Sequence, residues 1–255
     1  MKNLFIQRPA FVAYLTAGQR GLDFTKESAI ALADGGVDLL EIGVPFSDPI
    51  ADGPVIAQAM NDALSYSITL HSILETIYSI KQTMHIPIVL FTYFNPLFKT
   101  GIAKIMKEAK QAGVDAILTV DCPLEESAEY FSGAKSASMD TIGLISPSTE
   151  PERILKICQS EPAFLYYVCR NGTTGVKDSL PEDYVKNIAQ IKSLSKIPVI
   201  AGFGISTKKM ASSALECADG FVVGSLFVKA ISDGMSPLEL QQLASSLDPR
   251  ERAQR

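Results

Sequence analysis

The sequence predicts an α/β protein, a (β/α)8 TIM barrel, and three observations carry this prediction. Short apolar runs rich in β-branched residues alternate with helical patterns eight times along 255 residues. Hydrophobic residues make up 47% of the chain, enough for a large core, and no low-complexity stretch or linker divides it. An open doubly wound sheet is the alternative, but it usually has fewer strands. We expect one barrel domain over residues 1–255, with a short segment before the first strand.

The strands and helices are expected in alternation along the chain. The predicted strands are Phe11–Leu15, Asp38–Gly43, Ile86–Thr92, Ala116–Val120, Thr141–Ile145, Phe164–Val168, Ile197–Gly202 and Gly220–Gly224. The predicted helices are Lys26–Asp34, Leu70–Met84, Ile102–Ala112, Leu124–Ser136, Glu152–Ser160, Glu182–Ser195, Thr207–Cys217 and Pro237–Leu247, with an extra short helix near Pro54–Leu64. Glycines near helix ends, at Gly35-Gly36, Gly113 and Gly220, are expected as left-handed C-caps.

Charge and hydropathy narrow the classes of partner. The net charge of −5, from 23 basic and 28 acidic residues, argues against nucleic acid and anionic membrane as partners. No apolar run approaches a membrane span, and Met1–Arg8 is too short and too polar for a secretory signal. We therefore expect a cytoplasmic protein. The four scattered cysteines lack metal-ligand spacing and are expected as reduced thiols without a chemical role: Cys122, Cys158, Cys169 and Cys217.

Three carboxylates follow the second predicted strand, at the end of the barrel where catalysis is expected. Glu41 stands in an apolar strand and should point to the barrel interior or to the helix layer, where burial would raise its pKa. Such a group can act as a general acid or base, but it could equally be paired with a basic neighbour. Asp48 and Asp52 stand in turn sequences, so a plain turn-forming role is the alternative for both.

The last part of the chain suggests a site for an anion. Gly202–Ser206 follows the seventh predicted strand, and Gly224-Ser225 follows the eighth before another helical stretch. Barrels that handle phosphate esters often hold the phosphate with backbone N–H groups of these two loops and a helix N-terminus. The alternative is that the glycines only serve tight turns. Arg170–Gly175, after the sixth strand, could close over a ligand or be an ordinary surface loop.

Several chemistries are set aside by residue placement. His71 lies in a helical pattern and His85 precedes the third strand, so no metal site is expected at the carboxyl ends of the strands. No predicted strand contains a lysine for a Schiff base, and no Ser-His-Asp arrangement is credible. What remains is acid–base chemistry by carboxylates. It could be aided by tyrosines that could equally be core residues, namely Tyr14, Tyr93 and Tyr166.

The segment from Glu41 to Pro54, Glu-Ile-Gly-Val-Pro-Phe-Ser-Asp-Pro-Ile-Ala-Asp-Gly-Pro, closely resembles the signature of the tryptophan synthase α subunit family. Other matching segments follow in the family's order and spacing. They are Phe11-Val12, Leu15–Gly18, Asp121–Glu126, Tyr166, Arg170, Thr174-Gly175, Gly202–Ser206 and Val223–Ser225. The resemblance implies a (β/α)8 barrel that cleaves indole-3-glycerol phosphate to indole and glyceraldehyde 3-phosphate. It also implies an αββα heterotetramer in which a pyridoxal-phosphate β subunit receives the indole, with no cofactor in this chain.

The resemblance also implies roles for individual residues. Glu41 matches the family's catalytic glutamate, which would protonate indole C3, and Asp52 its catalytic aspartate, which would accept the indole N–H. Substrate contacts are implied for Tyr166, Thr174, Gly175, Phe203, Gly204, Gly224 and Ser225, the last three and Gly175 around the phosphate. Tyr14 and Tyr93, named above as aids to the carboxylates, are also expected to contact substrate. Contact with the β subunit or loop coupling is implied for Asp48, Pro49 and Asp121.

The chain departs from the family pattern mainly in loops. Ala13 replaces a usual proline, Gln19-Arg20 replaces Asp-Pro, and Thr173 departs from a usual valine. The segment before the first strand is also shorter. These departures leave open a regulatory subunit that binds ligand and activates its β partner while cleaving slowly or not at all. A different phosphate-ester barrel enzyme, such as an isomerase, is a third alternative, which the long signature disfavours.

Overall fold

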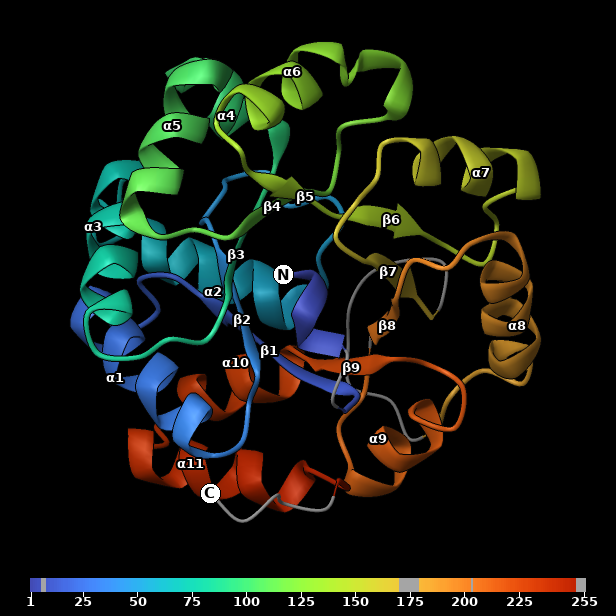
Figure 1. Cartoon of the computed structure of the whole chain (residues 1–255). Coiled ribbons are helices and arrows are strands. Elements are labelled where there is room, and N and C mark those ends of the chain that lie inside the picture. Colours follow the sequence, from blue (N-terminus) through green and yellow to red (C-terminus); the bar gives the residue numbers. More distant parts are fainter. Residues whose placement is uncertain (6–7, 170–178, 203, 251–255) are drawn as a thin grey trace.

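The computed structural model describes residues 1–5, 8–169, 179–202 and 204–250. Within them, nine parallel strand segments form one ring, and most helices surround it (Figure 1). The order around the ring is β5-β4-β3-β2-β1-β9-β8-β7-β6. The strands are β1 Ala10–Thr16, β2 Leu39–Gly43, β3 Ile88–Thr92, β4 Ala116–Thr119, β5 Asp140–Thr141, β6 Gly143–Ile145, β7 Leu165–Val168, β8 Val199–Gly202 and β9 Gly220–Val223. The predicted TIM barrel is confirmed.

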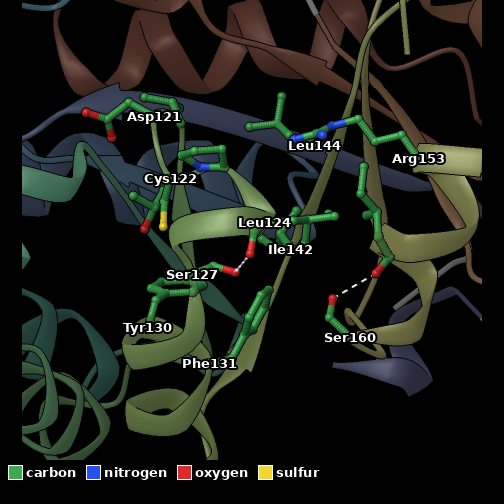
Figure 2. Close-up of a pocket in the computed structure, with 15 residues that line it drawn as sticks. Asp121, Cys122, Leu124, Ser127, Tyr130, Phe131, Ile142, Leu144, Arg153 and Ser160 are labelled. Carbon is green, nitrogen blue, oxygen red and sulfur yellow. Dashed lines mark hydrogen bonds between the residues drawn. The ribbon is translucent and has the colours of Figure 1, made fainter. Parts of the chain in front are cut away.

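One predicted strand is divided in the structure. The sequence predicts a single strand over Thr141–Ile145, but β5 pairs with β4 while β6 pairs with β7, and Ile142 lies between them. Because β5 and β6 belong to one continuous segment, the ring remains closed in spite of this division. A cavity of about 300 Å³ lies beside the division, between η2 (Leu124–Glu126) with α6 (Ala128–Ser136) on one side and α7 (Pro151–Gln159) on the other (Figure 2).

All predicted helices are present, three of them (α2, α5 and α11) with the predicted bounds and the others with shifted ends. The remaining helices are η1 Lys2–Phe5, α1 Leu22–Asp34, α2 Pro54–Leu64, α3 Leu70–Lys81, α4 Phe94–Thr100, α5 Ile102–Ala112, α8 Tyr184–Leu194, α9 Lys208–Ala214, α10 Ser225–Ser232 and α11 Pro237–Leu247. The predicted helix over Leu124–Ser136 is broken at Ser127. Helix α4 was not predicted, because Pro96 usually ends a helical pattern. In the structure it falls in the first turn of α4, where a proline lacking its N–H is tolerated.

Glycines and prolines set several element boundaries. Both β3 and β8 begin directly after a proline, two residues later than predicted, since Pro87 and Pro198 cannot donate to the ladder. Gly113 is the predicted left-handed C-cap of α5, with φ of 94°. The same prediction is wrong for Gly220, which opens β9 and has no positive φ. A Cβ there would meet the Ala10 carbonyl oxygen at 2.7 Å, so close strand approach explains this glycine.

The core has two layers that meet at the strands. Side chains between the strands and the outer helices form the larger layer, and alternate side chains of the same strands fill the barrel interior. Met1, Leu4 and Phe5 of the N-terminal segment pack against the interior layer, with the Phe5 ring 5.8 Å from that of Phe164. The N-terminus accordingly lies near the centre of the ring in Figure 1. This segment covers one end of the barrel, so the site lies at the other end.

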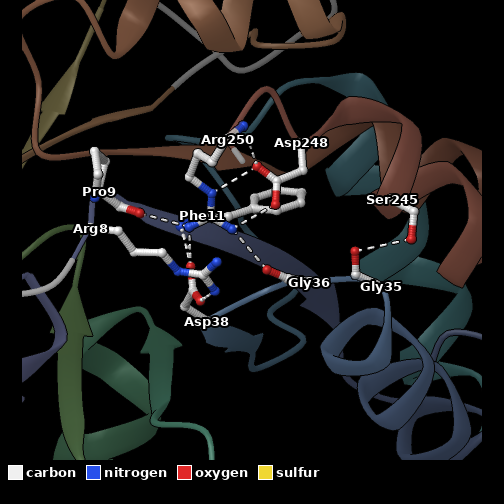
Figure 3. Close-up of polar contacts among 9 residues, drawn as sticks. All are labelled: Arg8, Pro9, Phe11, Gly35, Gly36, Asp38, Ser245, Asp248 and Arg250. Carbon is white, nitrogen blue, oxygen red and sulfur yellow. Dashed lines mark hydrogen bonds and ion pairs between the residues drawn. The ribbon is translucent and has the colours of Figure 1, made fainter. Parts of the chain in front are cut away.

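The end of the described chain is tied to the first strands by Arg250 (Figure 3). Its guanidinium, 5% exposed, donates to Asp248 Oδ1 at 2.7 Å and to the Gly36 carbonyl at 2.9 Å, and it also contacts Asp38. Asp38 in turn accepts the Phe11 N–H at 2.8 Å. The contacts of Arg250 with Asp38 and Gly36 join residues more than 200 positions apart, so they fasten the end of the described chain to the segment between α1 and β2.

Replacing Arg250 by Met is expected to lower the free energy of unfolding by roughly 3 kcal/mol, because it leaves the buried Asp248 carboxylate without its charged partner. Chemical denaturation measures this loss. The matched control is Arg153→Met, which breaks an exposed pair with Glu125 and should cost less than about 1 kcal/mol. Equal losses in both variants would contradict a stabilising role for the Arg250 contacts.

Candidate active site

Glu41 points into the barrel interior from the middle of β2. Its neighbours Leu40 and Ile42 belong to the outer core layer and Leu39 to the interior layer, so strand alternation places Glu41 inside. The residue is 0% exposed, and neither carboxylate oxygen has a hydrogen-bond partner among the described residues. Burial raises the pKa of Glu41 to about 8. The alternative of a pairing with a basic neighbour is therefore not observed, and the carboxyl holds a proton at neutral pH.

Asp52 lies in the loop between β2 and α2. The Tyr93 hydroxyl donates to its Oδ2 at 2.7 Å, and its own N–H donates to the Pro49 carbonyl at 3.0 Å. Burial raises the pKa of Asp52 to about 6, with the Tyr93 hydrogen bond opposing that rise. Asp52 is thus both a turn residue and a buried carboxylate, and it is mostly ionised at neutral pH.

Glu41 and Asp52 line one small cavity, which we call the polar compartment. The other residues that line it are Tyr14, Ile56, Phe91, Tyr166, Gly204, Val222, Gly224 and Ser225. Gly204 has φ of 86°, a left-handed conformation that favours glycine. Gly224 is the N-cap of α10 and Ser225 its first residue, so the free N–H groups of the first turn of α10 open beside this compartment.

Two tyrosines of the polar compartment lie against glycines of neighbouring strands. A Cβ on Gly43 would meet the Tyr14 hydroxyl at 2.1 Å, and a Cβ on Gly202 would meet the Tyr166 hydroxyl at 2.3 Å. The strand register also sets Tyr14 beside Glu41. The sequence analysis assigned no role to Gly43 and placed Gly202 in a phosphate loop, whereas the structure gives both a steric role. They make room for the two buried rings.

A second cavity of about 170 Å³, the apolar compartment, adjoins the first. Asp52, Phe91 and Tyr166 line both compartments. The remaining residues of the apolar compartment are Ala51, Leu118, Val120, Leu144 and Val168. The sequence analysis missed these side chains and Phe91. Strand alternation counted from Glu41 reaches Leu39 and Gly43 in its own strand, but Phe91 and Leu118 are found only through the register, which pairs Phe91 with Gly43 and with Leu118.

Other predicted site residues lie outside the two compartments. Tyr93, 1% exposed, lines neither of them, and its hydroxyl contacts Asp52. Asp48 and Asp121 are exposed and Pro49 is half-buried. Asp48 accepts the Ile50 N–H through its carbonyl, and Asp121 accepts the N–H of Phe94, the first residue of α4. The predicted residues that fall outside the described ranges are Arg170, Thr173, Thr174, Gly175 and Phe203.

The departures in the loop after β1 form contacts of their own. The Gln19 side chain donates to the Val228 carbonyl at 2.9 Å and to the Ser232 hydroxyl at 2.8 Å, both in α10. Arg20 donates to the Met235 carbonyl at 2.9 Å. Ala13 is fully buried in β1. Gln19 therefore ties this loop to the helix whose N-terminus borders the polar compartment.

The cavity of Figure 2 adjoins the apolar compartment, because Val120 and Leu144 line both. The Arg153 guanidinium, among its lining residues, donates to Glu125 at 2.8 and 3.0 Å. Burial and nearby carboxylates raise the pKa of the Cys122 thiol to about 11, which keeps it protonated. A thiol that stays protonated is a weak nucleophile.

The described residues hold no group of three or more His, Cys, Asp or Glu side chains that could bind a metal ion. His71 lies exposed on α3, beside Glu75. None of the nine strand segments carries a lysine. In the part of the chain that the structure covers, no helix is both long enough and apolar enough to span a membrane.

Comparison with known proteins agrees with this site and this fold. The profile of the family described as "Tryptophan synthase alpha chain" matches residues 2–252. The chain is 54% identical over 249 residues to the tryptophan synthase alpha chain of Coxiella burnetii, covering 98% of this chain and 97% of the relative. It is 44% identical to that of Chlamydia felis, covering 98% and 99%.

Solved structures give the same result. Tryptophan synthase of Mycobacterium tuberculosis superimposes with a TM-score of 0.90 at 28% identity, covering 96% of this chain and 95% of that one. Tryptophan synthase subunit alpha of Legionella pneumophila gives 0.83 at 33% identity, covering 94% and 91%. On the family match over nearly the whole length and these identities, the chain belongs to the tryptophan synthase alpha chain family.

Proposed function

We propose that this chain is the α subunit of tryptophan synthase and a carbon–carbon lyase, which cleaves indole-3-glycerol phosphate to indole and glyceraldehyde 3-phosphate. One observation carries the proposal beyond family membership. An apolar compartment adjoins a polar one at Asp52, and the polar one contains a buried, unpaired carboxyl. The apolar compartment, of about 170 Å³, would take the flat indole ring, and the glycerol phosphate chain would extend past Glu41 toward Gly224 and Ser225. The bond to be broken then lies near the boundary between them.

In this proposal Glu41 is the general acid. It holds a proton at neutral pH, because burial raises its pKa to about 8. It would protonate indole C3, so that the ring nitrogen takes up the positive charge and the ring acts as the electron sink. The resulting carboxylate would then take the proton of the glycerol 3′-hydroxyl as the C–C bond breaks and the aldehyde forms.

Asp52 and the loops after β8 and β9 would bind the indole nitrogen and the phosphate of the substrate, respectively. Ionised Asp52 would accept the indole N–H and stabilise the positive charge that develops on the nitrogen. Gly204, Gly224 and Ser225 would hold the phosphate through backbone N–H groups and the start of α10. No lysine, arginine or histidine lines the described part of either compartment, so a backbone site fits a phosphate in a chain of net charge −5.

We further propose that the loop over Ser47–Ile50 and helix α4 face a β subunit that carries the pyridoxal phosphate, in an αββα heterotetramer. Ile50 is 79% exposed and Phe98, on α4, is 61% exposed. Large apolar side chains at such exposure favour a partner surface. We take residues 1–255 as one barrel domain, and the cysteines of the described chain, which form no disulfide, fit a cytoplasmic location.

The pH dependence of indole release tests the assignment of the two carboxyls. Activity needs Asp52 ionised and Glu41 protonated, so kcat/KM, which reports the groups of the chain without substrate, is expected to rise as the pH increases through about 6 and to fall as it increases through about 8. Steady-state assays with indole-3-glycerol phosphate across this range measure the profile. A rate that keeps rising above pH 9 would contradict Glu41 as the acid. An undetectable rate, with a β subunit still activated, would favour the regulatory alternative.

A further inference from the structure

Tyr93 contacts the catalytic loop without touching the space for substrate. It follows β3 directly, is 1% exposed and lines neither the polar nor the apolar compartment. Its ring stacks on Phe46, with 4.9 Å between the ring centres and 26° between the planes. Its hydroxyl reaches the loop that carries Asp52. A tyrosine in this position can act on the reaction only through a neighbouring group.

The hydrogen-bond pattern fixes the direction in which the Tyr93 hydroxyl donates. Its oxygen accepts the Ala51 N–H at 3.1 Å, which takes up one lone pair. The same oxygen lies 2.7 Å from Asp52 Oδ2. Since Asp52 is ionised in the proposed mechanism and cannot donate, the single hydroxyl proton of Tyr93 must point to Oδ2. Tyr93 thus holds two consecutive residues of a loop that has no helix or strand of its own.

Tyr93 is itself held from both sides. Phe46 packs on its ring from the loop after β2, and Tyr93 is the N-cap residue of α4. The N–H of the next residue, Phe94, donates to Asp121 Oδ1 at 2.6 Å. Asp121 is exposed and follows β4. The position of the hydroxyl is therefore set by the backbone at the ends of two strands, which are rigid parts of the barrel.

We propose that Tyr93 is a positioning residue for the lyase reaction: its hydroxyl holds Asp52 by Oδ2 and thereby presents Oδ1 to the indole N–H of the substrate. This inference rests on the proposed function. It assigns to Tyr93 a role different from the substrate contact that is expected from the sequence. A loop carboxylate held by one oxygen keeps its orientation through the reaction, so less reorganisation is needed when charge develops on the ring nitrogen.

The same hydrogen bond affects the charge of Asp52. The titratable groups that face Asp52 from the described residues are Tyr93, Tyr14 and Tyr166, with Glu41 in the same compartment. Of these, Tyr93 is the one that donates to Asp52. Removing the donor would destabilise the carboxylate and raise the pKa of Asp52, so its ionised form would require a higher pH.

The test is Tyr93→Phe, which removes only the hydroxyl and keeps the stacked ring. We expect kcat for indole release to fall by about 10- to 100-fold while KM changes by less than about threefold, since the phosphate and the ring are bound elsewhere. The acidic limb of the kcat profile should move to higher pH by about one unit. The matched control is Tyr184→Phe, which removes a buried tyrosine hydroxyl that donates to the Ala214 carbonyl in the helix layer. It should leave kcat and the pH profile unchanged.

A double-mutant cycle separates positioning from a general effect on folding. If Tyr93 acts through Asp52, then Tyr93→Phe should reduce kcat by less than about threefold when Asp52 is already Asn. An equal loss in both backgrounds would overturn the proposal, as would a Tyr93→Phe variant with the kcat and acidic limb of the unmodified chain. If the unmodified chain releases no indole, the proposed function itself fails, which is a different outcome from either of these.

Discussion

Replacing Glu41 by Gln is expected to lower kcat for indole release by about 10³-fold or more, because the amide can neither give a proton to indole C3 nor take one from the hydroxyl. The side chain keeps its size, so phosphate binding by the loops of Gly204, Gly224 and Ser225 should persist. Steady-state indole release and binding of glycerol phosphate measure the two effects separately. The matched control is Glu75→Gln, the same change at an exposed position on α3.

The same substitution is expected to change the pH dependence of stability. The pKa of Glu41 rises from 4.5 to about 8 on folding, so the folded chain retains a proton that the unfolded chain loses. Stability therefore falls as the pH increases from 4.5 through 8, by roughly 4 kcal/mol between pH 5 and pH 9. Glu41→Gln removes this loss, and denaturation of both chains at the two pH values measures it. A parallel pH dependence in the two chains would show that Glu41 is not buried as an acid.

Replacing Asp52 by Asn is expected to lower kcat by about 10²- to 10³-fold, because a neutral amide stabilises the charge on the ring nitrogen much less than a carboxylate does. Binding of glycerol phosphate should remain, since Asp52 lies where the apolar and polar compartments meet and not in the loops proposed for the phosphate.

Asp62→Asn is the matched control for that substitution. Asp62 is exposed on α2, where it accepts from Gln58 at 2.8 Å. If Asp52→Asn abolished phosphate binding while Asp62→Asn did not, the assignment of Asp52 to the indole nitrogen would be wrong. Unchanged kcat in Asp52→Asn would exclude it from the mechanism altogether.

Local patterns in the sequence were sufficient for the barrel and for Glu41, whereas the role of Asp52 beyond a turn residue came from the family resemblance. Eight alternations of strand and helix predicted the ring, and Glu41 inside an apolar strand predicted a buried acid. The division of Thr141–Ile145 could not be read in the same way. It depends on two different pairing partners, β4 and β7, on either side of Ile142, and pairing between distant strands is not encoded in a local pattern.

The hydrogen bonds of the site could not be predicted from the sequence for a related reason, because they join residues that are distant along the chain. Tyr93 and Asp52 are 41 positions apart, and a tyrosine after an apolar strand is equally typical of core packing. The sequence led us to expect that Tyr93 contacts substrate, whereas its hydroxyl donates to Asp52. The steric roles of Gly43 and Gly202 likewise depend on rings from neighbouring strands, which only the register brings into contact.

Indole release from indole-3-glycerol phosphate, measured for the unmodified chain, Glu41→Gln and Asp52→Asn with and without a cognate β subunit, tests the central claim most directly. We predict that the unmodified chain releases indole in both conditions, and that both variants are slower by at least about 100-fold. Equal, negligible rates for all three chains, with the β subunit still activated by each, would contradict a carboxylate lyase and identify a regulatory subunit instead.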